Sequence, residues 1–164
     1  MNVSKLVKAT AVAAVITVAA TGTNAYALTA KEWTAKVAKD HPHDAAAFTA
    51  SKKGQIVNAA KAVKTTPLDA SAFVLSVYQK TTGITLAKTI YQQSQTGVTV
   101  KDKTALVPGD LVFFHLTGSG KTPTFVGIYT GKGNVTARTT KGVRTFSLND
   151  LYWKNKFVYG KRIF

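Results

Sequence analysis

The sequence predicts an α+β domain in which N-terminal helices pack on an antiparallel sheet of about five strands. Apolar residues recur at helical spacing in the first half of the chain, and short apolar runs between Gly and Pro turns fill the second half. Helices that come first, followed by strands, are typical of α+β folds. The 164 residues contain no internal repeat and no low-complexity linker, so one globular domain is expected.

Each expected helix has its own start or stop signal. Thr29 and Glu32 form a capping box, and Trp33 and Val37 lie one turn apart on the same face of the helix that follows. Asp69 has the residue type of an N-cap, and Gly83 stops the helix that it begins. The predicted helices are residues 29–39, 51–64, 69–81 and 89–95.

The strands are predicted from alternation and from apolar runs bounded by turns. Pro108, Gly109 and Asp110 form a turn before one run, and Gly131 and Gly133 mark a tight hairpin after another. The predicted strand segments are 98–100, 111–114, 124–129, 134–138, 143–147 and 157–163, with a short turn near 149–152.

Residues 1–27 have the pattern of a signal peptide. Lys5 and Lys8 give a basic start, Ala9–Ala20 is apolar, and Ala25 and Ala27 form a small-x-small cleavage site. The apolar run has 12 residues, fewer than the roughly 20 of a membrane-spanning helix. An uncleaved membrane anchor is the alternative interpretation. We therefore expect an exported protein with no transmembrane segment after cleavage, and a helical extension over residues 28–53.

The chain is strongly basic, with a formal net charge of +15. Removing Lys5 and Lys8 from the 22 basic residues, with all seven acidic residues retained, leaves +13 for residues 28–164. Such a charge favours polyanions, and those nearest to an exported protein are cell-wall polymers and lipid headgroups. The alternative is that scattered lysines only maintain solubility. The sequence has no basic recognition helix and no ribonucleoprotein-type aromatic motif, which argues against nucleic acid as a partner.

Three stretches carry a resemblance to a known family. They are Asp69-Ala70-Ser71-Ala72-Phe73-Val74, Leu106-Val107-Pro108-Gly109-Asp110-Leu111-Val112-Phe113-Phe114 and Phe125-Val126-Gly127-Ile128-Tyr129. Together they resemble the NlpC-type cell-wall cysteine peptidases. The resemblance implies a papain-like domain over residues 54–164 and an ancestral activity on peptidoglycan stem peptides.

The resemblance also implies where a catalytic set would lie. The Cys nucleophile of the family corresponds to Ala70, the general-base His to Phe125, and the third polar residue to Ala137, or to Thr136 if the register differs by one. A thiolate attacks, an imidazole takes up the proton and a third group orients it. The side chains of Ala and Phe can do none of this, and the chain contains no cysteine. We therefore expect no catalytic residues and a natural non-catalytic relative.

Other residues offer alternative chemistry. Ser71, His115 and Asp110 supply the residue types of a Ser-His-Asp triad, which requires mutual hydrogen bonds. His41, His43 and Asp44 supply metal-ligand types. Asp and Ser residues at these places are also ordinary helix-start and turn residues, and His-x-His beside a proline is typical of an exposed linker. We expect no metal and no cofactor.

Candidate binding residues are Asp69 and Ser71, which flank position 70, and Tyr152 and Trp153, which precede two lysines. The resulting hypothesis is a secreted, possibly wall-associated, non-catalytic protein that binds cell-wall polyanion, peptidoglycan or an unknown protein partner. One alternative is an active peptidoglycan hydrolase that uses unidentified residues. A second alternative is a cationic secreted antimicrobial protein.

Overall fold

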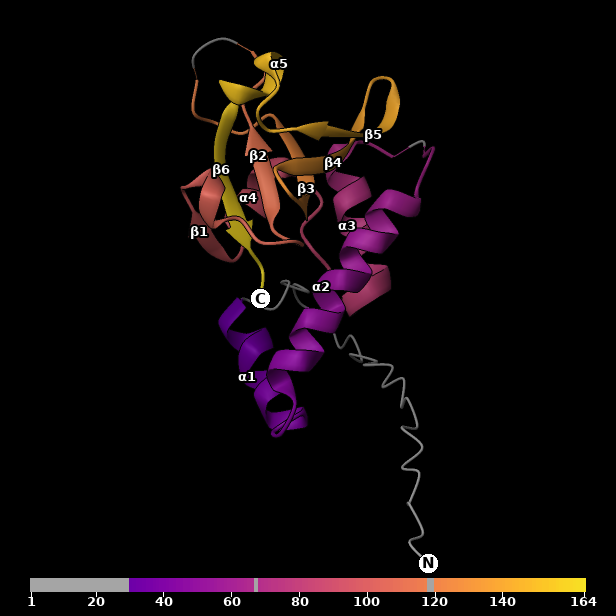
Figure 1. Ribbon diagram of the computed structural model, residues 1–164, viewed down its shortest axis with the longest axis vertical. Helices are drawn as coiled ribbons and strands as arrows, with labels where there is room; N and C mark the ends of the chain where they lie inside the picture. The colour runs from indigo at the N-terminus through magenta and orange to yellow at the C-terminus, as the bar shows by residue number, and fades with distance from the viewer. Residues whose placement is uncertain (1–29, 67, 118–119) are drawn as a thin grey trace, which may run out of the picture.

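The computed structural model describes residues 30–66, 68–117 and 120–164. The predicted signal peptide, residues 1–27, lies outside these ranges. Within them, helices α1, α2 and α3 precede the sheet along the chain, and α1 and α2 lie to one side of it (Figure 1). No helix in the described part of the chain is both long enough and apolar enough to cross a membrane.

The helices are α1 (Ala30–Asp40), α2 (Ala45–Ala62), α3 (Ala70–Thr82), α4 (Ile90–Ser94) and α5 (Leu151–Lys154). Four of the helices match predicted segments, apart from an earlier start of α2, whereas α5 forms where only a short turn near residues 149–152 was predicted. Helix α2 begins six residues before the predicted Ser51, because Ala45, Ala46 and Ala47 are good helix formers that follow directly on the turn at residues 41–44. The helix runs unbroken through residues 53 and 54, the expected junction between extension and domain.

The sheet has six antiparallel strands in the order β1-β6-β2-β3-β4-β5. They are β1 (Val98–Val100), β2 (Leu111–Phe114), β3 (Phe125–Gly131), β4 (Asn134–Thr139), β5 (Gly142–Ser147) and β6 (Phe157–Arg162). The short strand β1 lies at the predicted segment 98–100 and pairs with the C-terminal strand, Val98 opposite Arg162. The sheet thus has six strands where about five were expected. The predicted α+β fold class is confirmed.

The middle of the sheet is buried on both faces. All four residues of β2 are fully buried, which explains why this strand is a continuous apolar run and not an alternating one. Helix α3 packs against β3 and β4 and buries Phe73, Val74 and Val77. Gly127 in β3 is required by close packing, since a Cβ there would lie 2.5 Å from a methyl carbon of Val135.

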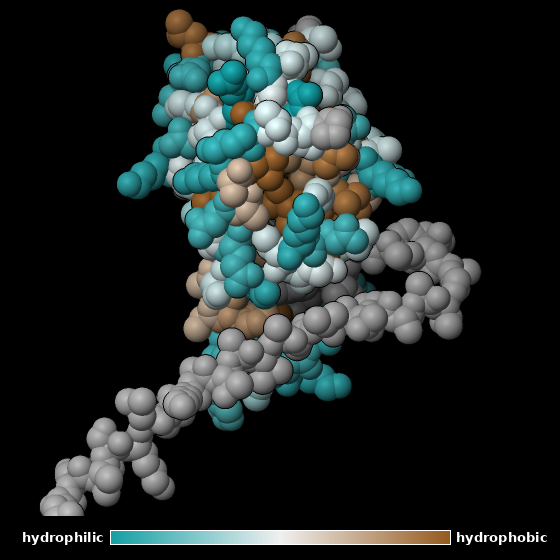
Figure 2. Space-filling model, turned by 90° about the vertical axis from the view of Figure 1, so that its right-hand side faces the viewer, coloured by the Kyte–Doolittle hydropathy of each residue, from teal (hydrophilic) through white to brown (hydrophobic). Residues whose placement is uncertain are grey.

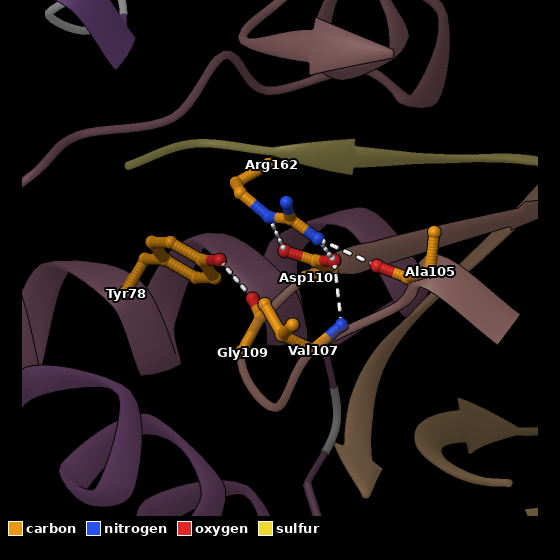
Figure 3. Close-up of polar contacts among 6 residues, drawn as sticks. All are labelled: Tyr78, Ala105, Val107, Gly109, Asp110 and Arg162. Atoms are coloured by element: carbon orange, nitrogen blue, oxygen red, sulfur yellow. Dashed lines mark hydrogen bonds and ion pairs between the residues drawn. The ribbon is translucent and has the colours of Figure 1, made fainter. Parts of the chain in front are cut away.

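An ion pair joins Asp110, in the turn before β2, to Arg162 at the end of β6. The carboxylate of Asp110 is 2% exposed and accepts hydrogen bonds from Arg162, 2.8 Å from Nη2 to Oδ2 and 3.1 Å from Nε to Oδ1 (Figure 3). The backbone N–H of Val107 donates to the same carboxylate at 2.9 Å. The hydrogen bond to Asp110 raises the pKa of Arg162.

The turn before β2 is anchored to a helix and to the C-terminal strand. The Tyr78 hydroxyl of α3 donates to the carbonyl of Gly109, and Arg162 Nη2 donates to the carbonyl of Ala105 at 2.8 Å (Figure 3). Burial raises the pKa of Tyr78, so its hydroxyl stays a donor. The Pro-Gly-Asp turn is therefore where α3, β2 and β6 are connected by hydrogen bonds.

Replacing Asp110 with Ala should destabilise the fold. The change leaves the guanidinium of Arg162 and the N–H of Val107 without their partner in a largely buried place. Because a third of the Arg162 side chain reaches solvent, we expect a loss of about 2–3 kcal/mol, below the range for a fully buried pair. Urea unfolding measures the loss. Asp40→Ala, which opens the exposed Lys36–Asp40 pair, is the control and should leave the midpoint nearly unchanged. Equal effects of the two changes would contradict a stabilising role of the Asp110–Arg162 pair.

Candidate active site

The three positions that match the family's catalytic set all lie in buried parts of the described chain. Ala70 is the first residue of α3 and is 9% exposed, Phe125 begins β3 and is 8% exposed, and Ala137 in β4 is fully buried. A Cβ on Gly127 would lie 2.9 Å from the Cβ of Ala137, so these two positions face the same side of the sheet. Phe125 is two residues from Gly127 and shares that side.

Phe125 is part of an aromatic cluster that consists of Phe114, Phe125, Phe146 and Trp153. The ring of Phe125 stacks on Trp153 with a centroid distance of 5.5 Å and an interplanar angle of 28°, and it lies 6.0 Å from Phe114. Trp153 also stacks on Phe146 at 3.8 Å and 12° and meets Phe114 edge-on at 5.1 Å. The place expected for a general base thus lies against aromatic rings from β2 and α5, and Phe146 of β5 packs on the same two rings.

The two predicted aromatic binding residues differ in their surroundings. Trp153 is half-buried by the aromatic cluster. Tyr152 is 57% exposed, and the ammonium of Lys156 lies 4.7 Å from the centre of its ring. Leu151, beside them, is almost fully exposed. Of the pair, only Tyr152 presents most of its surface to solvent.

Asp69 and Ser71, the other two candidate binding residues, stabilise the start of α3. Oδ1 of Asp69 accepts the backbone N–H of Ala72 at 2.8 Å and the hydroxyl of Ser71 at 2.8 Å. The Ala72 N–H, followed by the Ser71 hydroxyl, lowers the pKa of Asp69. Ser71 is buried, whereas Asp69 is exposed. Their polar groups are engaged as an N-cap.

The Ser-His-Asp alternative is not assembled in the described part of the chain. The hydroxyl of Ser71 donates to Asp69, and the carboxylate of Asp110 is paired with Arg162. Nδ1 of His115 lies 2.5 Å from the carbonyl oxygen of Thr122. Since each group has a different partner, these three side chains do not form the relay that a triad needs.

The His-x-His segment is occupied by local contacts. The His41 ring stacks on Phe48 at 4.0 Å, and its Nδ1 lies 3.5 Å from Oδ1 of Asp44. His43 is exposed in the same turn. Within the ranges that the structure describes, no three His, Cys, Asp or Glu side chains are grouped to hold a metal ion.

Gln93 is a residue near the site that the sequence did not indicate. It is fully buried in α4, and its Nε2 donates to the carbonyl of Ser71 at 2.9 Å and to that of Ala87 at 2.8 Å. Its Oε1 has no hydrogen-bond partner among the described residues. Gln93 therefore holds the first turn of α3, where Ala70 lies. Gln92 and Gln95 stand beside it in the sequence, and nothing there distinguishes Gln93 for this role.

One side of the molecule carries an apolar patch (Figure 2). On the side of the molecule that carries the β4–β5 hairpin, hydrophobic residues form a patch bordered by hydrophilic ones (Figure 2). Neither of the two hollows described for the molecule is lined by Ala70, Phe125 or Ala137. Because Ala70, Phe125 and Ala137 are each at most 9% exposed, their side chains contribute to packing.

Replacing Phe125 with Ala should destabilise the protein by about 3 kcal/mol, because a nearly buried ring and its stacking contacts are lost. Chemical denaturation of the purified variant measures the change. Tyr91→Ala is the matched control, since Tyr91 is 63% exposed. Its effect should stay below about 0.5 kcal/mol. A Phe125 variant as stable as the control would contradict the packing described above.

Stability should depend on Asp69 in acid. The folded chain binds a proton at Asp69 less readily than the unfolded chain, whose carboxyl titrates near the ordinary pKa of 3.8. Its contribution is therefore complete above that value and is lost as pH falls through the lower pKa of the folded state. Asp69→Asn keeps a capping oxygen that does not titrate. Thermal unfolding between about pH 5 and pH 2 should show a smaller loss for this variant than for the wild type. Identical pH profiles would contradict the prediction.

Two curated proteins of Escherichia coli are similar in sequence to this chain. The chain is 40% identical over 97 residues to NlpC of Escherichia coli K12, a probable endopeptidase, a match that covers 58% of this chain and 62% of that protein. It is 35% identical over 97 residues to MepS of the same strain, a murein DD-endopeptidase and LD-carboxypeptidase, over 58% of this chain and 50% of that one. The chain thus spans less than two thirds of either relative.

A solved structure shows the same fold. RipD of Mycobacterium tuberculosis, described as a non-catalytic NlpC/p60 domain protein adapted to peptidoglycan binding, superposes with a TM-score of 0.57. The match covers 69% of this chain and 98% of RipD at 17% identity. The model of the NlpC/P60 family matches residues 54–162, more than half of the 164-residue chain. The protein belongs to the NlpC/P60 family.

Proposed function

We infer that this chain is a secreted, non-catalytic member of the NlpC/P60 family that binds the cell wall, through peptidoglycan, an attached polyanion or a wall-associated protein. The observation that carries the proposal is the set of side chains at the three matching positions. Ala70, Phe125 and Ala137 offer no nucleophile, no proton acceptor and no orienting group.

The packing around Phe125 supports the same conclusion. A general base must reach the proton that it abstracts within hydrogen-bonding distance. Here the ring at the expected base position packs against Phe114 and Trp153. Loss of the nucleophile alone can reduce turnover about a million-fold in a catalytic unit of this type.

Location and binding are supported by the relatives and by charge. MepS acts on murein, and RipD is described as adapted to peptidoglycan binding. Murein and peptidoglycan lie outside the cytoplasm, which supports an extracytoplasmic location and is in keeping with the signal-peptide pattern of residues 1–27. The net charge of +15 favours association with the anionic polymers of a wall.

Purified protein incubated with sacculi should release no soluble muropeptides and should sediment with the walls. MepS serves as the active control in the same assay, with muropeptides followed by chromatography. Retention on walls should fall as salt rises, because exposed charges are screened. Muropeptide release by the purified chain would contradict the proposal, and its abolition by Ser71→Ala or His115→Ala would identify the residues responsible. Failure to sediment, combined with killing of indicator cells without lysis of their walls, would favour the antimicrobial alternative.

A further inference from the structure

A hollow of about 510 Å³ lies beside the C-terminal strand, away from the catalytic positions. We name it the β6 hollow. It is bordered by β1, by β6 and by segments next to the β2–β3 connection. Its described lining residues are Thr99, Lys101, His115, Gly120, Lys121, Asn155, Lys156, Phe157, Val158 and Tyr159.

The charge of the β6 hollow is of one sign. Lys101, Lys121 and Lys156 line it, and none of its described lining residues is acidic. Two further lysines touch the lining. Nζ of Lys161 donates to the Thr99 hydroxyl at 2.9 Å, and Nζ of Lys103 lies 5.2 Å from the centre of the Phe157 ring.

Three of these ammonium groups are positioned by neutral oxygens. Lys156 donates to the carbonyl of Leu116 at 3.3 Å, Lys103 donates to the carbonyl of Lys154 at 2.7 Å, and Lys161 donates to a hydroxyl. A neutral acceptor fixes one of three N–H donors and leaves the charge uncompensated. The described ion pairs of the molecule lie elsewhere. The hollow therefore holds ordered positive charge with donors free for an anion.

Partial burial removes water from two of these ammonium groups and so disfavours their charged form. Desolvation lowers the pKa of Lys103, with the nearby charge of Lys154 adding to the effect, and desolvation also lowers the pKa of Lys161. A bound anion would offset both causes.

The walls of the hollow are not only polar. Phe157 and Tyr159 contribute aromatic rings, and Lys161 Nζ lies 5.7 Å from the centre of the Tyr159 ring. Rings beside ammonium groups suit a ligand that alternates anionic groups with short carbon segments, since each part then finds a matching surface. A phosphodiester polymer of a small polyol has this alternation.

We propose that the β6 hollow binds the phosphodiester groups of an anionic wall polymer of the polyol-phosphate class. This assignment rests on the proposed extracellular function and names the ligand and the site for it. Catalytic positions play no part in it.

The test compares two double variants of the full chain that lose equal charge. Lys101→Gln with Lys121→Gln alters two exposed side chains of the β6 hollow. Lys39→Gln with Lys80→Gln alters two exposed lysines of α1 and α3 and is the matched control. Soluble poly(glycerol phosphate) is titrated into each protein over a series of salt concentrations, and thermal unfolding verifies that each variant is folded.

The hollow variant should bind poly(glycerol phosphate) at least roughly tenfold more weakly than the wild type. Its affinity should also depend less steeply on salt, because fewer counterions are released. The control should bind as the wild type does. Equal weakening of both variants would show that only net charge matters and would contradict binding at the β6 hollow.

Two further experiments distinguish a wall polymer from a lipid as the source of the phosphate, and distinguish failure of this inference from failure of the proposed function. Phosphatidylglycerol vesicles should bind more weakly than the polymer at equal phosphate concentration; tighter binding to vesicles would assign the hollow to lipid and overturn the proposal. Sacculi stripped of anionic polymer should retain the protein poorly. Undiminished retention on stripped sacculi would overturn this inference and leave wall binding intact, whereas muropeptide release would refute the proposed function instead.

Discussion

The packing of Phe125 against Trp153 makes the position expected for a general base part of the apolar interior. A ring that stacks at 5.5 Å on one aromatic neighbour and lies 6.0 Å from another, Phe114, is held in place by dispersion and by burial of apolar surface. An imidazole at this position would bring a polar group that needs hydrogen-bond partners into the same environment. The aromatic cluster joins β2, β3, β5 and α5, so the residue expected to take part in proton transfer contributes to stability instead.

The framework of the fold does not depend on that position. Asp110 and Arg162 fasten the turn before β2 to the last strand, and Asp69 caps α3. None of these contacts uses Ala70 or Ala137. Active sites commonly keep polar groups at some expense in stability, and apolar residues at such places relieve that expense. A scaffold built this way can retain its architecture after the reactive side chains are replaced.

Local signals in the sequence were sufficient for most of the architecture. Asp69 predicted the start of α3, Gly83 its end, and the apolar run at 111–114 a buried strand, because caps, turns and runs are encoded by neighbouring residues. The early start of α2 was missed, because the prediction followed an apolar spacing that begins only at Ile56. The position of Trp153 against Phe146 was also missed. Contacts between distant segments leave no trace in periodicity, and the same holds for the lysines that meet at the β6 hollow.

The central claim is that Phe125 and Trp153 act as one packing unit, and a double-mutant cycle tests it most directly. Unfolding free energies of the wild type, Phe125→Ala, Trp153→Ala and the double variant give the coupling between the two rings. The packing predicts a favourable coupling of about 0.5–1.5 kcal/mol. A coupling indistinguishable from zero would contradict it, because the two rings would then contribute to stability independently of each other.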